Sequence, residues 1–393
     1  MKKTGDTKLL IDLGEQPISN RYLKHSSDQR ELFPLKLGQC QKTGLIQLID
    51  PIAYEELVPR YDWVTYYEPE SHLDALVNKV ARLYLKKNCP VVGGISFKDK
   101  STIERFERLG NQSWTIDPIQ DLKLGENAGV ESVQAELNIE RSKEIVNRNG
   151  RADLLVVRHI WEHVYVQDLF VAALKELVAG DGYILFEVPD CSNLINHLDY
   201  TMIWEEHLYY YTLLTFKQSL QHYGFAIIDV EVVPSGTYEN SLIALVRVQT
   251  SKKVKNNIKK AELEKALHRG NNYAKKYKSQ RKMISEYLSK ESRKRKIMLF
   301  GAGHISGAFI NHLSLQDLIE CVVDDNAYKQ GLLMPKSIIP IVHSKELYKY
   351  DSTLCLFAVN PIHEDKITSK HKKFMEKGGR FGSICPLSDY SIY

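Results

Sequence analysis

Short apolar segments alternate with helical segments along much of this chain, and this alternation constrains the fold more than any other feature. Apolar runs of strand length occur at 90–95, 113–116, 153–157 and 183–188. The segments between them have the pattern of helices. Strands that alternate with helices form a largely parallel sheet that is covered on both faces. We therefore predict a doubly wound α/β domain over residues 76–250, finished by two successive strands at 226–233 and 241–248.

A second α/β unit of Rossmann-like type is predicted over residues 296–393. Its strand at 296–300 runs into Gly301-Ala-Gly303-His304, a helix follows at 308–313, and the strand at 319–323 ends in Asp324. Glycines right after a strand allow close approach to a phosphate, and an acidic residue about 20 positions later can hold a ribose. The pattern favours a nucleotide site. A glycine turn that serves packing alone is the alternative.

The remaining parts are an N-terminal lobe over residues 1–75 and a connector over 251–295. Turn residues interrupt the lobe's short apolar runs, so we expect it to be small and poor in strands. The segment 252–296 holds 17 Lys and Arg against four Glu, which indicates a helical connector with a solvated basic face. No stacking module accompanies this charge, so nucleic acid is not predicted as a partner.

Composition excludes several other classes. Apolar residues make up 43% of the chain and charged residues 26%, as in an ordinary globular protein. No apolar run approaches the roughly 20 residues of a membrane helix, and the first residues lack the apolar region of a secretory signal. Six scattered cysteines fit reduced thiols. We expect a cytoplasmic enzyme that does not contact the membrane.

Trp204-Glu205-Glu206-His207 is the strongest candidate for chemistry. Histidine can act as a base near neutral pH, and a neighbouring glutamate can orient its ring. Two adjacent carboxylates are costly to bury without partners, which favours a polar cleft. A solvated loop with an ordinary ion pair is the alternative interpretation.

His159, Glu162 and His163 have a spacing that is similar to a metal-binding helix motif. They follow a predicted sheet strand, however, and we interpret them as a loop that borders a cofactor cleft. The prediction is that this loop holds no metal.

Several phrases together resemble one enzyme family. They are Leu13-Gly14-Glu-Gln-Pro17 and Gly44-Leu-Ile-Gln47 in the lobe, His159-Ile-Trp-Glu162-His163 and Glu187-Val-Pro189 in the middle, and Asp324-Asp-Asn326 to Gly331 with Val359-Asn360 near the end. The chain resembles the sugar C-methyltransferases, S-adenosylmethionine-dependent enzymes that alkylate a carbon next to the ketone of a nucleotide-linked deoxysugar. The resemblance implies a small lobe, a class I methyltransferase-like middle domain and a Rossmann-like C-terminal domain.

The resemblance also implies roles for individual residues. Within the motif at 204–207, Glu206 and His207 match the family pattern, whereas Trp204 and Glu205 depart from it. His207 would abstract the proton next to the ketone, Glu206 or Glu205 could orient its ring, and Tyr66 would donate a proton to the sugar oxygen. The nucleotide-diphosphate sugar would contact Trp204, Tyr210, Asn240, Gly301, Gly303, His304, Asp324, Lys329 and Asn360. S-adenosylmethionine would lie near Gly93, Gly94, Ser96, Lys98, Asp117 and His159.

Two departures from the family pattern affect these expectations. The family's lobe usually binds zinc through two cysteine pairs, whereas Cys40 is the lone cysteine of residues 1–75. We predict no zinc. The family's glycine-rich loop is replaced by Ser96-Phe97-Lys98-Asp99-Lys100, and a lysine there would repel a sulfonium.

Three functions stay open on the sequence. The leading one is a nucleotide-sugar C-methyltransferase. The second keeps the fold and substrate class but performs proton transfer without a methyl donor, as an epimerase, isomerase or dehydratase does. The third is a binding protein whose middle domain is a relic.

Overall fold

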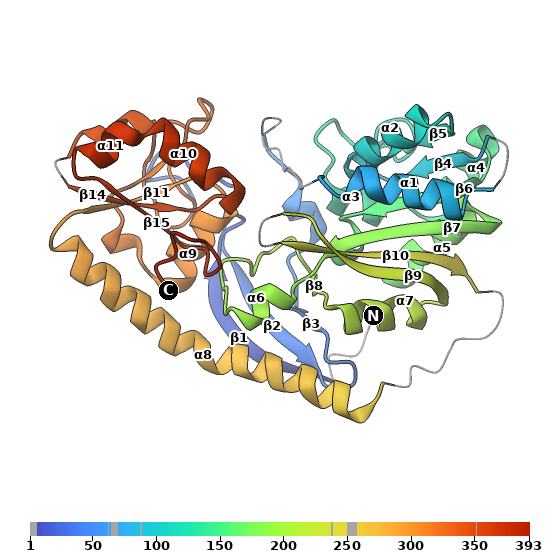
Figure 1. Ribbon diagram of the computed structural model, residues 1–393, viewed down its shortest axis with the longest axis horizontal. Helices are drawn as coiled ribbons and strands as arrows, with labels where there is room; N and C mark the ends of the chain where they lie inside the picture. The colour runs from blue at the N-terminus through green and yellow to red at the C-terminus, as the bar shows by residue number, and fades with distance from the viewer. Residues whose placement is uncertain are drawn as a thin grey trace.

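The computed structural model describes residues 6–61, 63, 70–86, 89–236, 239–249, 258–350 and 352–393. It contains three sheets, which correspond to the N-terminal lobe, the middle domain and the C-terminal domain (Figure 1). The predicted fold class, a small lobe with two Rossmann-like α/β units, is therefore confirmed.

The N-terminal lobe is an antiparallel sheet rather than the strand-poor lobe expected from its turn residues. Its strands, in the order β1-β2-β3-β8, are β1 (Thr7–Gln16), β2 (Phe33–Cys40), β3 (Ile46–Ile49) and β8 (Tyr209–Tyr210). Pairing with β1 and β3 makes β2 a strand despite its Pro34, which lies at the strand's start. The fourth strand comes from the middle of the chain. It therefore connects the lobe directly to the candidate motif at 204–207.

The middle domain is a six-stranded sheet in the order β5-β4-β6-β7-β10-β9. The strands are β4 (Val91–Gly94), β5 (Gln112–Thr115), β6 (Ala152–Arg158), β7 (Val178–Pro189), β9 (Phe225–Pro234) and β10 (Asn240–Val248). The first four pair in parallel, and β10 pairs antiparallel with β7 and β9. The strand that follows β4 lies on one side of it and the next strand, β6, lies on the other side, so a topological switch point lies between β4 and β6.

Two apolar cores explain why the strands of this sheet are nearly continuous hydrophobic runs. Along β6, Leu154 and Val156 belong to one core, whereas Leu155 and Val157 belong to the other. Helices α1 (Leu73–Leu83) and α2 (Lys100–Arg108) cover the first face. The second face is covered by α3 (Val130–Glu136), α4 (Ile139–Asn149), α5 (Gln167–Leu177) and α7 (Leu213–His222).

The C-terminal domain is an all-parallel sheet in the order β13-β12-β11-β14-β15. Its strands are β11 (Lys296–Phe300), β12 (Cys321–Val323), β13 (Ile341–Val342), β14 (Thr353–Phe357) and β15 (Arg380–Ser383). Its helices are α9 (His304–Leu313), α10 (Glu364–Lys370) and α11 (Lys372–Glu376). Helix α9 begins four residues earlier than the sequence indicated, directly after Gly303, its N-cap.

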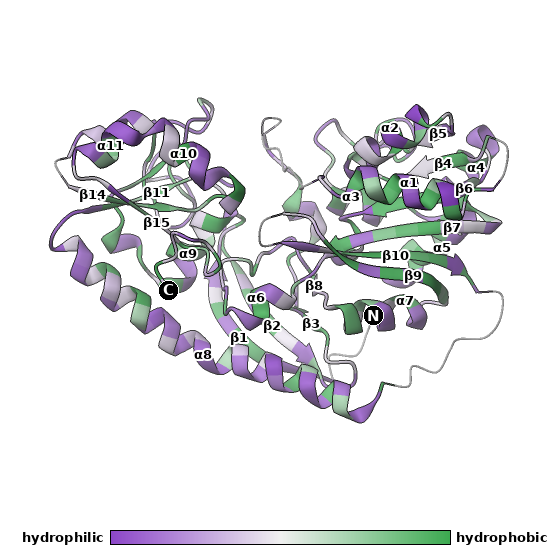
Figure 2. Ribbon diagram, in the orientation of Figure 1, coloured by the Kyte–Doolittle hydropathy of each residue, from purple (hydrophilic) through white to green (hydrophobic). Residues whose placement is uncertain are grey.

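Helix α8 (Lys260–Ser292) is the predicted basic connector, and it passes along the lobe's sheet to the C-terminal domain (Figure 1). Its buried side includes Tyr273, Tyr277, Ile284 and Leu288, and its opposite side is mainly hydrophilic (Figure 2). Among the described residues, we find no helix with the length and apolar character needed to cross a membrane.

Candidate active site

The motif 204–207 lies in a buried loop between α6 (Ser192–Asn196) and β8, where all three parts of the molecule meet. The indole of Trp204 stacks on the imidazole of His304 at the start of α9, with ring centroids 4.3 Å apart and planes 10° apart. The Tyr210 hydroxyl accepts a hydrogen bond from the Trp204 backbone N–H at 2.9 Å. Tyr210 is 1% exposed, so it fixes this loop instead of contacting substrate.

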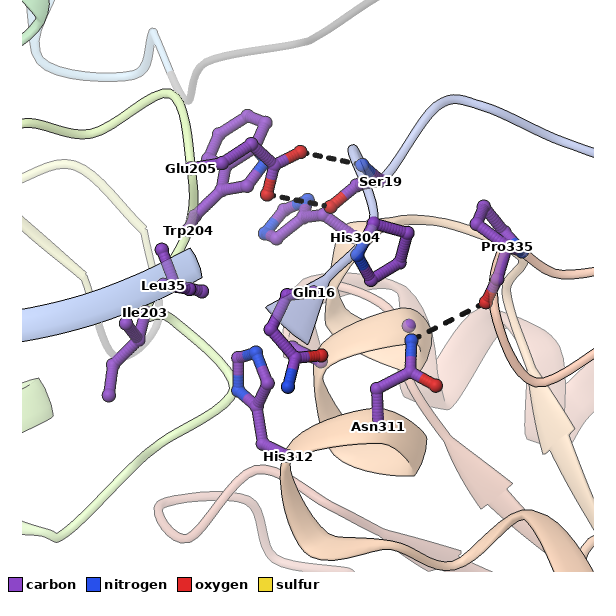
Figure 3. Close-up of a pocket in the computed structure, with 13 residues that line it drawn as sticks. Gln16, Ser19, Leu35, Ile203, Trp204, Glu205, His304, Asn311, His312 and Pro335 are labelled. Atoms are coloured by element: carbon purple, nitrogen blue, oxygen red, sulfur yellow. Dashed lines mark hydrogen bonds between the residues drawn. The ribbon is translucent and has the colours of Figure 1, made fainter. Parts of the chain in front are cut away.

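Glu205 points toward the N-terminal lobe. Its carboxylate accepts hydrogen bonds from the backbone N–H of Ser19 at 2.6 Å and from the Ser19 hydroxyl at 3.2 Å (Figure 3). Burial raises the pKa of Glu205 above its ordinary value. These bonds give Glu205 a structural role that joins the loop to the lobe, and its assistance to His207 stays a prediction.

His207 lies beside a carboxylate that the motif itself does not contain. The side-chain ligand atoms of Glu162, His163 and His207 all lie within 4.8 Å of one another. Glu162 and His163 belong to the short turn Trp161–His163 after β6, and Glu162 is 1% exposed. The rings of His163 and His207 meet edge to face, with centroids 4.7 Å apart. Sequence spacing gave no sign of this pairing, because Glu162 and His207 come from separate loops.

His163 is held in place through its Nδ1 atom. This atom lies 2.7 Å from the backbone oxygen of Glu206 and 3.0 Å from a carboxylate oxygen of Glu131. Burial alone would lower the pKa of His163, but the hydrogen bond and charge of Glu131, together with the charge of Glu162, raise it. The charge of Glu162 therefore favours the protonated form of His163.

Glu206 is a buried acid next to this group. Burial, followed by the charges of Glu131 and Glu205, raises its pKa well above the ordinary value of 4.5. A carboxyl group in these surroundings favours its neutral form, which can donate a hydrogen bond.

Glu162, His163 and His207 also have the donor set of a divalent-metal site, two imidazoles and one carboxylate. The raised pKa of His163 opposes metal binding, because an imidazole must lose its proton on that nitrogen to coordinate. His159, the other histidine of the spacing motif, lies between the carboxylates of Glu162 and Glu187. Its ring nitrogens lie 3.6 Å from Glu162 and 3.5 Å from Glu187.

The loop after β4 tests whether S-adenosylmethionine fits the middle domain. The buried Asp99 carboxylate accepts backbone hydrogen bonds from Ile95, Ser96 and Arg158, each at 2.8 Å. The Ser96 hydroxyl accepts the N–H of Lys98, and the Arg158 guanidinium donates to the Lys98 carbonyl at 2.8 Å. Internal partners therefore hold the backbone that would face the methionine part of the cofactor.

Other predicted cofactor residues also have structural partners. A Cβ on Gly93 would meet the Trp114 ring at 2.6 Å, and one on Gly94 would meet Thr115 at 3.1 Å. These glycines make room for side chains of the neighbouring strand β5, not for a ligand. Asp117 is exposed at the end of β5, where a ribose would lie, although its Oδ1 accepts the N–H groups of Ile119 and Gln120. Ser96 to Lys100 do not fit the methionine side of the cofactor, and a ribose at Asp117 stays a prediction.

The predicted nucleotide loop of the C-terminal domain is closed in a similar way. The Asp324 carboxylate accepts the N–H of Ala302 at 2.8 Å and that of Asn326 at 2.8 Å. Lys329 donates to the Ala302 carbonyl at 2.8 Å and lies 3.2 Å from Asp324. Gly301 has φ +106°, and a Cβ there would meet Val359 at 2.5 Å. The packing alternative therefore explains Gly301, Asp324 and Lys329, and Gly303 caps α9.

Three predicted residues remain to be placed. Asn240 pairs within the sheet through β10, and its carbonyl accepts the N–H of Asp190. Asn360 donates from its side chain to the carboxylate of Glu239 at 3.0 Å, which links the C-terminal and middle domains. Tyr66 lies outside the residues that the structure describes.

A small cavity adjoins the motif where lobe, loop and α9 meet (Figure 3). Its polar wall contains Gln16, Ser19, Glu205, His304, Asn311 and His312. The sequence had identified Trp204, Glu205 and His304 among its lining residues. It missed Gln16, Ser19 and the α9 side chains, which no motif singles out.

Sequence comparisons agree with this architecture. A model described as C-methyltransferase C-terminal domain matches residues 241–387, one described as methyltransferase domain matches 100–230, and one for a zinc binding domain matches 3–57. A curated relative, C-methyltransferase NovU of Streptomyces niveus, is 23% identical over 398 aligned positions, which cover 97% of this chain and 93% of that protein.

Two solved structures are similar to part of the chain. One is the N1-methyltransferase of 1,6-didemethyltoxoflavin from Burkholderia thailandensis, solved with S-adenosylhomocysteine. It is 15% identical with a TM-score of 0.35, and the match covers 57% of this chain and 98% of that one. An S-adenosylmethionine-dependent methyltransferase from Anabaena variabilis is 14% identical with a TM-score of 0.31, over 50% of this chain and 92% of that one.

The doubly wound middle sheet defines the class of this protein as a Rossmann-like α/β enzyme of the S-adenosylmethionine-dependent methyltransferase type. The three domain matches and the near full-length relative are all of C-methyltransferase type, so the chain is similar to C-methyltransferases along most of its length.

Proposed function

We propose that this enzyme acts on a nucleotide-linked keto-deoxysugar and that His207 abstracts the proton on the carbon next to the ketone. The reaction of the family that it resembles is methylation of that carbon. Proton removal must come first, because the carbon becomes nucleophilic only as the enolate. Two observations support this substrate class. The chain matches C-methyltransferase models, and Glu206 and His207 resemble the motif of the sugar C-methyltransferases.

The observation that carries the proposal is the grouping of His207 with Glu162. A buried carboxylate next to an imidazole favours the imidazolium that forms when the base accepts a proton. His163, anchored on the Glu206 backbone and on Glu131, limits how Glu162 can move. Glu162 is therefore proposed as a positioning residue for the base.

Glu206 is proposed as the group that stabilises the enolate. Its raised pKa favours the neutral carboxyl group, which can donate a hydrogen bond to a developing oxyanion. Tyr66, the proton donor indicated by the family resemblance, stays a prediction.

S-adenosylmethionine would supply the methyl group in the family's reaction. The closed loop from Ser96 to Lys100 favours a second candidate, in which the enzyme returns a proton to the enolate and so epimerises or isomerises the sugar. Both candidates use His207 in the same way. They differ in whether a methyl donor takes part.

Proton exchange in D₂O tests the proposal. The full chain is incubated with a panel of nucleotide-linked 4-keto-deoxysugars, and deuterium at the carbons next to the ketone is followed by NMR. We expect exchange that falls by about 10²-fold or more in His207→Ala and less in Glu162→Gln, with His222→Ala on α7 as the matched control. No exchange with any keto sugar, or full exchange by His207→Ala, contradicts the proposal. Adding S-adenosylmethionine then separates the candidates, since a methylated product appears in the first alone.

A further inference from the structure

The carboxyl edge of the middle sheet holds buried charges at the point where a fold of this kind binds its ligand. In doubly wound sheets, that point is the crevice at the topological switch point, here between β4 and β6. Asp99 follows β4, Arg158 is the last residue of β6, and Glu187 lies near the end of β7. Asp99 and Glu187 are 0% exposed, and Arg158 is 1% exposed. A ligand in this crevice would have to compete with these charged side chains.

Arg158 connects the loop after β4 to strand β7. It pairs with Glu187 in the register of the sheet, and its Nε donates to the Glu187 carboxylate at 2.5 Å. Its Nη1 donates to the Lys98 carbonyl at 2.8 Å, and its backbone N–H donates to the Asp99 carboxylate at 2.8 Å. One residue thus makes polar contacts on both sides of β6. We call Asp99, Arg158 and Glu187 the edge network.

The segment before α1 adds side chains to the same edge. The Nε2 atom of His72, the N-cap of α1, lies 2.8 Å from a Glu187 carboxylate oxygen. Glu70 accepts a hydrogen bond from the Ser101 hydroxyl at 2.5 Å and lies 3.3 Å from the Arg105 guanidinium, both on α2. The N-terminus of a helix that follows a strand is where such folds bind charged ligands. Here the chain's own side chains cover the start of that helix.

The loop after β4 has its backbone donors directed at one of its own carboxylates. In the family that the chain resembles, the backbone of this loop passes close to the methionine part of the cofactor. Here the N–H groups of Ile95, Ser96 and Arg158 donate to Asp99, and Ser96 and Asp99 form a capping box around the turn 97–99. A ligand could use these N–H groups only after Asp99 left its buried position. Breaking the bonds of a buried charge lowers an affinity by about 10²-fold or more.

We propose that the middle domain of this chain does not bind S-adenosylmethionine, because the edge network occupies the crevice in its place. The inference goes beyond the proposed function, since it concerns the crevice and holds for any substrate. The similarity to C-methyltransferases then lies in the fold and in Glu206 and His207, not in methyl transfer. Proton transfer by His207 requires no methyl donor.

Calorimetry with the full chain tests the inference, with S-adenosylmethionine, S-adenosylhomocysteine and adenosine as probes. We expect no saturable binding of the first two up to about 1 mM, or an affinity no more than about twofold above that of adenosine. The methionine part then contributes nothing to binding. Binding of either compound about tenfold or more tighter than adenosine overturns the proposal, and so does a methylated sugar product. Urea unfolding confirms that the protein is folded.

Amide hydrogen exchange provides a second measurement that does not depend on a ligand. Asp99→Ala should increase the exchange rate of the amides at 95–99 about tenfold or more, because they lose their buried acceptor. Asp168→Ala, an exposed aspartate on α5 in the same domain, is the matched control and should leave these rates unchanged. If Asp99→Ala does not fold, Asp99→Asn should show a smaller increase at the same amides. Unchanged rates in a folded Asp99 variant contradict a closed crevice.

This inference and the proposed function can fail separately. Deuterium exchange on a keto sugar without binding of S-adenosylmethionine supports both. No exchange on any keto sugar and no binding of S-adenosylmethionine removes the proposed function and leaves the closed crevice standing. Exchange on a keto sugar together with tight binding of S-adenosylhomocysteine does the reverse.

Discussion

The carboxylate of Glu205 accepts hydrogen bonds from both the backbone N–H and the hydroxyl of Ser19, and these bonds join the site loop of the middle domain to the N-terminal lobe. Glu205 and Ser19 both line the cavity beside the motif at 204–207. Loss of the carboxylate therefore leaves a buried backbone donor unsatisfied as well as the cavity wall incomplete.

We predict that Glu205→Ala lowers the free energy of unfolding by about 1–3 kcal/mol, the cost of an unsatisfied buried donor. Glu205→Gln, whose amide oxygen can still accept, should lose less. Ser19→Ala keeps the stronger backbone bond and should lose the least. Urea unfolding measures the three changes. Equal losses of unfolding free energy in all three variants would show that the bond to the backbone N–H of Ser19 contributes no more to stability than the bond to its hydroxyl.

The second prediction concerns the buried pair Glu187 and Arg158, whose Oε2 and Nε atoms lie 2.5 Å apart. Burial alone would raise the pKa of Glu187, but bonds from His159 and His72 and the charge of Arg158 hold it well below 4.5. A depressed pKa stabilises the fold above the unfolded value, and this contribution disappears as the pH falls through the folded value. Glu187→Gln should thus cost about 3–5 kcal/mol at pH 7.

The pH dependence distinguishes this pair from an ordinary ion pair. The difference in unfolding free energy between wild type and Glu187→Gln should be constant above pH 4.5 and shrink as the pH falls below it. Glu136→Gln, which breaks a partly exposed pair with Arg141, is the control and should cost no more than about 1 kcal/mol. A difference that stays constant down to pH 3 contradicts the assignment.

Glu206 should behave in the opposite sense. Its pKa is raised by burial and by the charges of Glu131 and Glu205, so the folded state holds its proton more tightly than the unfolded state does. Stability from this group is complete below the unfolded pKa of 4.5 and falls as the pH rises toward the folded pKa.

Glu206→Gln, which copies the neutral acid, should therefore gain on the wild type as the pH rises from 4.5. The gain is up to about 1.4 kcal/mol per pH unit until the folded pKa is reached. Urea unfolding between pH 5 and 8 measures it, with the exposed Glu144→Gln as control. Parallel curves for Glu206→Gln and wild type would show that Glu206 is ionised in the fold.

The fold was predictable because its signal lies within short segments. Leu154 to Val157 are all apolar, as expected for a strand of a sheet that is covered on both faces. The structure places them in two cores, one on each face. The lobe was harder to predict, because β8 is two residues long and comes from another part of the chain. Local turn residues say nothing about such a partner.

The site was predictable in part, since motifs name residues but not their partners. His207 and Glu206 were expected, whereas the carboxylate beside His207 is Glu162 from another loop. Asp324 and Asp99 follow strands as ligand-binding carboxylates do, yet each accepts hydrogen bonds from its own loop. Arg21, Arg60 and Lys336 line one cavity but come from three separate segments, so their grouping becomes visible only after folding.

Metal removal tests whether either of two regions binds an ion, the N-terminal lobe or the cluster of Glu162, His163 and His207. The N-terminal lobe matches a zinc binding domain over residues 3–57, but Cys40 is its lone cysteine, and a tetrahedral structural site needs four ligands. In the site, the raised pKa of His163 opposes coordination of a metal by Glu162, His163 and His207, because an imidazole nitrogen must be deprotonated to bind a metal. We therefore predict that EDTA changes neither the thermal midpoint nor the exchange activity, and that Cys40→Ser unfolds as the wild type does. Stoichiometric zinc by mass spectrometry, or a lower midpoint after EDTA, contradicts the prediction. Cys40→Ser and His163→Ala would then show which cluster binds the ion, since only the variant that removes a ligand should lose it.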